Sequence, residues 1–326
     1  MTLGRTLLYL SRTDIEGLGL GVSEIVGLLR SAFQERAAGR ALMPGKIWIM
    51  RSPDTFYSAM PCYLASLGAA GVKWSSGTPR GPADDLPYIL GLYILNDAET
   101  GAPLAIMDST WITAMRTGAA TALTVECLAN AGAQDLAILG CGVQGRSNLD
   151  AIAASPVAVR AVQAYDVKPD VAARYAEEMS GTLRLDVRAA RSAREAIDGA
   201  SVVVTAGSND RPRDGLIEPE WIAPGAVSVS INRDTFWSRA AIDAMDCVVT
   251  DDARSIDHMK EHGLFQTVTR IDAELGDIVA GHHPGRERPD ARILAFNLGV
   301  ALEDLATAAE LYRRARAAGA GTELPL

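Results

Sequence analysis

Three glycines follow an apolar run near the middle of the chain. Gly140, Gly142 and Gly145 form a complete G-x-G-x-x-G after Leu136–Leu139, a run that reads as a buried parallel strand. The first glycine permits a tight turn, the second lets the backbone approach a pyrophosphate, and the third lets the next helix pack closely on the strand. Amides at the helix N-terminus would face the anion. The spacing therefore predicts a dinucleotide-binding loop, in preference to a glycine-rich turn without a ligand.

An acidic residue ends the next strand-like run and limits the choice of dinucleotide. Asp166 follows Ala161–Tyr165, about 20 residues beyond the glycines, where a carboxylate can accept a hydrogen bond from a ribose 2′-hydroxyl. The same carboxylate would repel a 2′-phosphate. We therefore expect NAD(H) as the cofactor, and the nearby Lys168 keeps NADP(H) as the less favoured alternative.

Arg116 occupies the middle of a helical face that is otherwise apolar. Ile112, Ala119 and Leu123 share this face at helical spacing. A guanidinium cannot lose its proton, so burial of the face would require an anionic partner. Arg116 either binds the anion of a ligand, or it extends to water or pairs with a structural carboxylate.

Polar residues follow two strand-like runs of the region that contains the glycines. One run ends at Thr205–Ser208 and the next at Asn232–Asp234. Ligands of open α/β sheets bind outside the carboxyl ends of the strands, so both ends should border the ligand crevice. Asp234 is the acid that we select there, and the alternative is a turn-forming Asp.

Alternating strand and helix patterns surround the glycine loop. Strand-like runs occupy 135–139, 160–165, 184–189, 201–206, 225–231 and 246–250, and helical stretches separate them. This alternation is typical of βαβ units. The sequence therefore predicts an α/β fold with a Rossmann-type, doubly wound parallel sheet over residues 131–292.

A different pattern precedes this region. After a short strand-like run at 6–10 and a helix at 22–38, consecutive β-like runs cover 46–50, 56–60, 71–74, 88–95 and 103–107. Strands without intervening helices indicate an antiparallel sheet. We expect a separate α+β domain over residues 1–130, ending in a helix at 109–130 and completed by residues 293–326.

Length and composition limit the classes of function. A chain of 326 residues is long enough for about two domains, and its net charge of −9 without a Lys/Arg cluster argues against nucleic acid. Apolar runs are too short to span a membrane, and the N-terminus turns polar too early for a secretory signal. We therefore expect a cytoplasmic protein without a membrane partner. The scattered cysteines should be reduced thiols.

Two other kinds of site are set aside. His258 and His262 stand at i and i+4 and could present two imidazoles on one helix face. Because no Glu follows His258 directly and no third ligand is evident, we expect no metal. The sequence has neither a G-x-S-x-G motif nor a Cys–His pairing, which argues against a nucleophilic hydrolase.

Motifs beyond the glycine loop indicate a family. They are MPGK (43–46), AMP (59–61), GVKW (71–74), LNDAETGAPLAIMD (95–108), TAMRTGAA (113–120), LGCGVQG (139–145) and YD (165–166). Over nearly its whole length the chain resembles the ornithine cyclodeaminase/μ-crystallin family, most closely its archaeal-type alanine dehydrogenase branch. The resemblance implies a homodimer formed through the first domain, and NAD(H)-dependent hydride transfer that interconverts an α-amino acid with its α-imino or 2-oxo acid. The alternatives are a cyclodeaminase that recycles NAD within each turnover, and a non-catalytic ligand-binding protein.

The resemblance also implies roles for individual residues. Lys73 would polarise the substrate or donate a proton beside the reacting carbon, and Asp234 would be the general acid/base. The substrate would contact Lys46, Met60, Lys73 and Arg116, with Lys46 and Arg116 on its carboxylate. The cofactor would contact Arg116, Thr117, Gly140, Gly142, Val143, Gln144, Gly145, Asp166, Val167, Thr205, Ser208 and Val300. Of these, Thr205 and Ser208 would lie on the nicotinamide side.

Three places depart from the alanine dehydrogenase pattern. Ser58 stands where an Arg that assists in carboxylate binding is expected, and Phe236-Trp237 replaces a small Pro-Gly turn. Near the C-terminus, Phe296–Gly299 reads FNLG in place of Asp-Ser-Thr-Gly, which would put apolar groups near the nicotinamide. These departures predict a substrate that is larger or more apolar than alanine.

Overall fold

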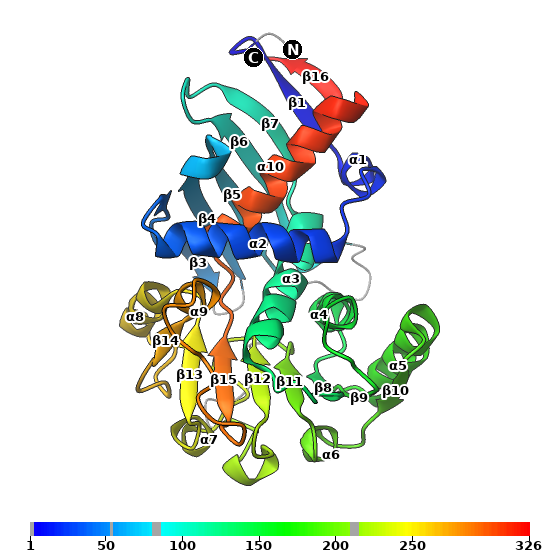
Figure 1. Ribbon diagram of the computed structural model, residues 1–326. Helices are drawn as coiled ribbons and strands as arrows, with labels where there is room; N and C mark the ends of the chain where they lie inside the picture. Colours follow the sequence, from blue (N-terminus) through cyan, green and yellow to red (C-terminus); the bar gives the residue numbers. More distant parts are fainter. Residues whose placement is uncertain (1–2, 53–54, 80–85, 209–214) are drawn as a thin grey trace. The chain divides into compact units, whose positions relative to one another are not determined.

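The computed structural model describes residues 3–52, 55–79, 86–208 and 215–326, and the chain divides into two compact units (Figure 1). The first unit comprises residues 1–116 and 300–326, and the second comprises residues 117–299. Helix α3 (Thr110–Leu128) starts in the first unit and continues in the second. The boundary that we expected at 130/131 therefore falls earlier, because one unbroken helix carries the chain from one unit into the other.

In its described residues, the first unit contains a mixed eight-stranded sheet. Its strands are β1 (Thr6–Leu10), β2 (Ala41–Leu42), β3 (Ile47–Ser52), β4 (Thr55–Leu64), β5 (Ala69–Gly77), β6 (Ile89–Asp97), β7 (Pro103–Asp108) and β16 (Thr322–Pro325). They lie in the order β16-β1-β7-β6-β5-β4-β2, with β3 also paired to β4. Strands β3 to β7 pair antiparallel as predicted, whereas β1 lies parallel to β7, to which no hairpin joins it.

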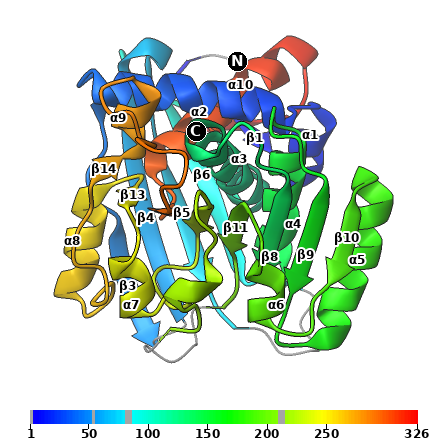
Figure 2. The same ribbon diagram turned by 60° about the horizontal axis from the view of Figure 1, so that its bottom comes forward.

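Helices cover one face of this sheet. They are α1 (Arg12–Gly17), α2 (Val22–Ala37) and α10 (Ala301–Ala318), with a 3₁₀ turn, η1, at Ala65–Leu67. Helix α10 packs on β4, β5 and β6, and α2 packs on α10 (Figures 1 and 2). Helix α2 buries Ile25, Leu29 and Phe33 at the spacing that predicted it. The C-terminal segment therefore completes the core of the first unit, as expected.

The strand period gives the sheet of the first unit two different faces. Met60, Lys73, Tyr93 and Met107 are cross-strand neighbours on β4 to β7, and all four are buried. The adjacent row consists of Ile47, Ala59, Trp74 and Leu92, from β3 to β6. Because successive side chains of a strand point to opposite faces, Lys73 is 2% exposed whereas Trp74 is 45% exposed.

In its described residues, the second unit contains an eight-stranded parallel sheet of the predicted Rossmann type. The strands are β8 (Asp135–Leu139), β9 (Ala161–Tyr165), β10 (Asp186–Ala189), β11 (Val202–Thr205), β12 (Val227–Ser230), β13 (Cys247–Thr250), β14 (Ala273–Glu274) and β15 (Ile293–Phe296). Their order is β10-β9-β8-β11-β12-β15-β13-β14. The strand order reverses between β8 and β11, which is where such sheets bind ligands.

Strand β15 belongs to a different unit from the one predicted. We expected residues 293–326 to belong to the first domain, but β15 pairs with β12 and β13 in the parallel sheet, and only residues from 300 onward return to the first unit. The run Ile293–Phe296 is four residues long, and nothing in its sequence indicates that it inserts between two earlier strands. Sheet order is a tertiary property that a local pattern does not contain.

The helices of the second unit connect these strands. They are α4 (Val143–Ala153), α5 (Pro169–Leu183), α6 (Ala193–Ile197), α7 (Arg239–Asp243), α8 (Ala253–Glu261) and α9 (Leu275–Val279), with a 3₁₀ turn, η2, at Pro219–Trp221. Within the described ranges, no helix is both long and apolar enough to cross a bilayer. The cysteines are free thiols, as expected, and three of the four are buried.

An acidic side chain satisfies the start of α3. The amide of Trp111 donates to the carboxylate of Asp108 at 2.9 Å. An Asp side chain satisfies a helix N-terminal amide as well as a Ser does. The Asp108 that ends β7 therefore also begins α3.

Gly118 allows α3 and α4 to approach closely. A Cβ atom at Gly118 would lie 2.3 Å from the backbone oxygen of Ser147 on α4. The glycine of the TAMRTGAA motif is therefore needed for packing, because it lets α4, the helix that follows the glycine loop, pack closely on α3.

We predict that Gly118→Ala destabilises the protein by about 1–3 kcal/mol, because the added methyl group overpacks against backbone that cannot easily move. The control is Gly27→Ala in α2, where a Cβ would meet nothing within 4 Å. That change should stabilise by up to about 1 kcal/mol through helix propensity. Urea unfolding of both variants provides the measurement, and a stabilised Gly118→Ala would contradict the close helix contact.

Candidate functional site

Each glycine of the G-x-G-x-x-G loop has a separate structural reason. Gly140 has a φ of 107°, and a Cβ there would lie 2.5 Å from the amide nitrogen of Gly207. A Cβ at Gly145 would lie 2.2 Å from the carbonyl oxygen of Gly140. At Gly142 a Cβ would meet nothing within 4 Å, so this glycine leaves open space at the N-terminus of α4. The loop therefore fits a pyrophosphate, which needs close access to backbone amides.

Arg146 and Asp166 hold the loop in shape. The guanidinium of Arg146 donates to the carbonyl oxygens of Cys141 and Gly142 and pairs with Glu178 at 2.6 Å. Asp166 accepts from the amides of Cys141 and Lys168, each at 3.0 Å. Each carboxylate oxygen has two lone pairs, so Asp166 can still accept from a ribose hydroxyl. This geometry suits the role predicted for Asp166.

The other residues predicted to bind the cofactor lie at the same edge of the parallel sheet or on the first unit. Val143 and Val167 are exposed beside the loop and beside Asp166. Gln144 is in the first turn of α4. Thr117 is buried on α3 in the second unit, whereas Val300, the N-cap of α10, belongs to the first.

The side chain of Thr205, a residue predicted to lie on the nicotinamide side, makes its hydrogen bonds inside the second unit. It is fully buried, and its hydroxyl lies 2.7 Å from Oδ1 of Asn232 and 2.9 Å from the hydroxyl of Ser230. Asn232 in turn donates to Thr235 at 3.1 Å. The Thr205 side chain therefore orients the Asn232–Asp234 segment from inside the unit. Ser208, three residues on, follows β11 at the carboxyl edge.

Asp234 lies in a sharp turn after β12. Its neighbour Arg233 adopts a φ of 62°, a conformation that non-glycine residues rarely adopt. The hydroxyl of Thr267 donates to the Asp234 carboxylate and fixes its orientation. Asp234 is half-buried, so a carboxylate held by one hydroxyl retains acceptor positions for a further partner.

In the first unit, Lys73 and Arg116 meet over one carboxylate. Lys73 Nζ lies 2.8 Å from Oδ1 of Asp304, and Arg116 Nε lies 3.2 Å from the same oxygen. Arg116 Nη1 also pairs with Glu303 at 2.7 Å, and Lys73 donates to the hydroxyl of Thr113 at 3.3 Å. All four charged side chains are buried. We call Lys73, Arg116, Glu303 and Asp304 the charge cluster.

The environment of Lys73 lowers its pKa to about 8, mainly because burial removes water from the ammonium. The positive charges of Arg116 and Lys46 lower the pKa further, whereas Asp304 raises it. Lys46 is half-buried just before β3, 6.0 Å from the ring of Trp48. A lysine that titrates near neutrality can exchange a proton during a reaction, as the resemblance implied for Lys73.

Glu303 and Asp304 pair with the predicted site residues Lys73 and Arg116, and they were not among the residues selected from the sequence. They stand in the first turn of α10, where acidic residues also interact favourably with the helix dipole. A buried Arg116 was expected to need an anionic partner. Two carboxylates from the C-terminal helix α10 provide it. The sequence does show two adjacent acids at the start of the last helical stretch, and these could have been selected as partners for Arg116.

Two of the three departures from the alanine dehydrogenase pattern have structural explanations. Phe236 packs against Gly207 and Trp237 is fully buried, so both belong to the interior of the second unit. Phe296 is buried edge-to-face against Phe265, at 5.5 Å between ring centroids. The packing of these rings gives no independent support for a larger or more apolar substrate, which stays a prediction. Ser58 remains, buried on β4 with its hydroxyl 2.9 Å from that of Ser75.

Comparisons with known proteins identify the family of the chain. Residues 7–319 match the model of the Ornithine cyclodeaminase/mu-crystallin family. The chain belongs to this family. It is 31% identical to N-((2S)-2-amino-2-carboxyethyl)-L-glutamate dehydrogenase of Staphylococcus aureus, over 99% of this chain and 100% of that protein. The resemblance inferred from the motifs is thus confirmed.

Solved structures of the ornithine cyclodeaminase/mu-crystallin family resemble this chain over nearly its full length. The Thermococcus litoralis Δ(1)-pyrroline-2-carboxylate reductase in complex with NADH and L-proline has a TM-score of 0.87 and 32% identity, covering 97% of this chain and 99% of that chain. An archaeal alanine dehydrogenase dimer with bound NAD has a TM-score of 0.85 and 29% identity, covering 98% and 99%. Members of the family thus combine this fold with a nicotinamide cofactor.

We predict that Asp304→Asn lowers the pKa of Lys73 below about 8, because it removes the carboxylate that favours the ammonium form. Stability should fall by about 3 kcal/mol or more, since a buried ion pair loses one partner. Carbon-13 NMR of labelled lysine measures the titration, and the chain has lysines only at 46, 73, 168 and 260.

Glu303→Gln is the matched control for this experiment. Glu303 is the neighbouring buried carboxylate and pairs with Arg116 at 2.7 Å. This variant should leave the Lys73 titration near pH 8. An unchanged Lys73 signal in Asp304→Asn would contradict the contact between Lys73 and Asp304.

Proposed function

We propose that the protein is an NAD(H)-dependent oxidoreductase that interconverts an α-amino acid with its α-imino or 2-oxo acid. The observation that carries the proposal is the charge cluster, in which two buried cations from separate elements converge on Asp304. A reductase with bound NADH and L-proline is 32% identical to this chain, and an alanine dehydrogenase with bound NAD is 29% identical. Proline and alanine are both α-amino acids, in which the carboxylate is attached to the carbon that carries the nitrogen.

The second unit provides the residues for the cofactor. The amides at the start of α4 donate to the pyrophosphate, which the open space at Gly142 admits, while Asp166 accepts from the adenosine ribose. An acid at this position favours NAD(H) over NADP(H). When bound, the cofactor supplies or accepts the hydride at the α-carbon.

The first unit provides the residues for the substrate carboxylate. Lys73 and Arg116 attract it electrostatically, with Lys46 adding positive charge. An ammonium has three N–H donors, and Asp304 and Thr113 use two of them. Lys73 therefore keeps one donor for a substrate atom. With a pKa of about 8, it holds its proton at neutral pH and can release it as the substrate nitrogen becomes more basic.

Asp234 is the proposed general acid/base. Imine reduction adds a hydride to carbon and a proton to nitrogen, and amino acid oxidation reverses both steps. The Asp234 carboxylate, fixed by Thr267, is suited to carry this proton. Ser58 replaces one expected cation, so a small substrate such as pyruvate, with little apolar surface to compensate, should bind weakly.

We predict NADH oxidation with cyclic α-imino carboxylates such as Δ(1)-pyrroline-2-carboxylate, at a kcat/KM at least about tenfold above that with pyruvate and ammonia. Both substrates lose about 1.5–3 kcal/mol with the missing charge-assisted hydrogen bond, and the ratio arises because the ring of the cyclic imine offsets this loss by apolar burial, which the single methyl group of pyruvate does less well. Absorbance at 340 nm with a panel of substrates gives the values. A preference for pyruvate would overturn the substrate class, and ammonia release from a diamino acid without net absorbance change would indicate a cyclodeaminase.

Asp234→Asn separates catalysis from binding in the same assay. It should lower kcat by about 10²-fold or more, which is typical for loss of a general acid/base. The matched control is Asp243→Asn. Asp243 accepts from Thr269 at 3.2 Å in the way that Asp234 accepts from Thr267, but it is an exposed residue at the end of α7. If Asp234→Asn retained full activity, as in a non-catalytic binding protein, the proposed role would be wrong.

We also propose that the protein forms a homodimer through the first unit. Ile47, Trp74 and Leu92 lie in one cross-strand row and are exposed, and Tyr57 stacks on Trp74 at 5.9 Å. A contiguous exposed apolar face on a sheet is typical of a protein interface. The archaeal alanine dehydrogenase relative is described as a dimer.

Placing charges on this face should disrupt the dimer. We predict that the double change Trp74→Glu and Leu92→Glu yields monomers, because burying unpaired carboxylates in an interface is unfavourable. Leu324→Glu, at an exposed apolar residue on β16 of the same sheet, is the control and should remain dimeric. Light scattering after gel filtration measures the mass, and a dimeric double variant would place the interface elsewhere.

A further inference from the structure

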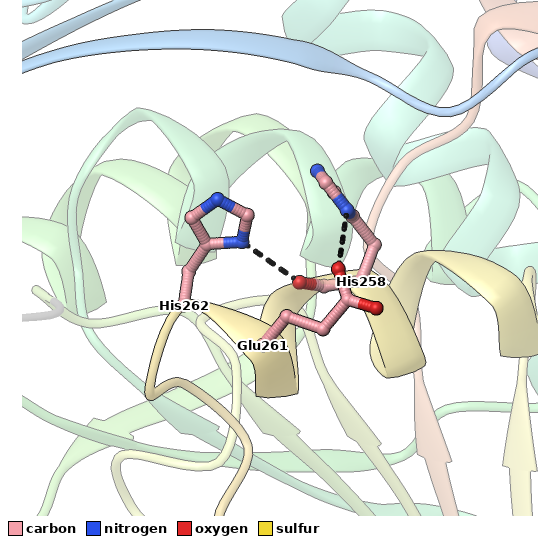
Figure 3. Close-up of side chains that lie close together, drawn as sticks. All are labelled: His258, Glu261 and His262. Atoms are coloured by element: carbon pink, nitrogen blue, oxygen red, sulfur yellow. Dashed lines mark hydrogen bonds and ion pairs between the residues drawn. The ribbon is translucent and has the colours of Figure 1, made fainter.

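One face of α8 presents two imidazoles and a carboxylate together. His258, Glu261 and His262 are all exposed, and each offers a ligand atom within 4.8 Å of those of the other two (Figure 3). The two rings lie 4.7 Å apart between centroids. The cluster belongs to none of the sites described above for the cofactor or the substrate.

The local fold of α8 explains this arrangement. Ser255, Ile256 and Met259 form the buried side of the helix. Residues at i, i+3 and i+4 lie on one helix face, so His258, Glu261 and His262 project together on the solvent side. The sequence analysis recognised the two histidines but found no third ligand, since it looked for a Glu directly after His258. Helical spacing places the third group at i+3.

Close contacts at Nδ1 orient both rings, through a hydrogen bond at His262 and an ion-pair contact at His258. Nδ1 of His262 lies 2.9 Å from the carbonyl oxygen of His258, which can only accept, so Nδ1 carries the proton and Nε2 keeps its lone pair. Nδ1 of His258 lies 3.3 Å from the carboxylate of Glu261 (Figure 3). Metal-ligating histidines commonly donate their second N–H to a backbone carbonyl or a carboxylate, which fixes the tautomer.

We propose that His258, Glu261 and His262 form a surface binding site for a divalent late first-row transition metal ion, with Zn²⁺ as the probe. Two imidazoles and a carboxylate suit Zn²⁺, and water completes a tetrahedral shell at an exposed position. Ca²⁺ and Mg²⁺ require oxygen ligands and do not fit a site with two nitrogen donors. This assignment does not rest on the proposed oxidoreductase activity.

Metal binding at this site also acts on the segment that follows α8. His262 is five residues before Thr267, the residue that donates to Asp234. Backbone hydrogen bonds from the amides of Gly263, Leu264 and Val268 close this segment. A metal ion that joins residues 258 and 262 stabilises the last turn of α8, and with it these hydrogen bonds.

The test is calorimetric titration of the full-length, untagged protein with ZnCl₂. We expect one ion per chain, no saturable binding of Ca²⁺ or Mg²⁺, and no saturable Zn²⁺ binding by the double variant His258→Gln and His262→Gln. Glu261→Gln should weaken binding by about tenfold or more. Zinc should also slow hydrogen exchange at the amides of residues 262–268. Binding that leaves these amides unaffected would overturn the coupling to the Thr267 segment.

The remaining histidines provide the matched control. The chain has four, and His282 and His283 lie next to each other in a loop, where Nδ1 of His283 already accepts from the amide of Gly285. The double variant His282→Gln and His283→Gln should bind Zn²⁺ like the parent protein. Zinc binding that survives the loss of His258 and His262, or that disappears with His282 and His283, would overturn the proposed site.

Discussion

Burial of Lys73 together with Arg116 is the constraint on which the first unit depends. Two like charges inside a protein repel one another and lose their hydration, so they persist only where carboxylates face them. Asp304 contacts both cations and Glu303 contacts Arg116. The cluster is therefore close to balanced when Lys73 is protonated. Addition of a further carboxylate from a substrate would favour the ammonium form, so substrate binding and Lys73 protonation should support each other.

This constraint explains why the chain must return to the first unit after completing the second. The cations come from β5 and α3, early in the chain, whereas their carboxylates come from the first turn of α10, near its end. Helix α10 packs across β4, β5 and β6 and delivers both acids to the buried face of the sheet. A first unit that lacked residues 300–326 would contain two buried cations without these anions.

Sequence reasoning succeeded where the signal is local. The strands of both sheets have short-range periodicity, and the glycines at 140, 142 and 145 have the geometric roles that their spacing predicts. It failed where the answer depends on packing between distant segments. The insertion of β15 between β12 and β13, the burial of Phe236 and Phe296, and the pairing of Arg116 with α10 all follow from tertiary contacts. The aromatic residues were read as pocket residues because a family pattern does not indicate which way a side chain points.

The two sets of site residues also differ in how freely they can change. The cofactor loop is limited by backbone geometry, since a side chain at Gly140 or Gly145 would collide with backbone atoms. The proposed substrate side is limited by charge, and it includes neutral residues such as Ser58 and Ser75, whose hydroxyls lie 2.9 Å apart. A change from Ser58 to a cation would alter affinity for small carboxylates while leaving the cluster of Lys73, Arg116, Glu303 and Asp304 intact. Substrate preference can therefore vary on this scaffold through residues next to the cluster, with the hydride chemistry unchanged.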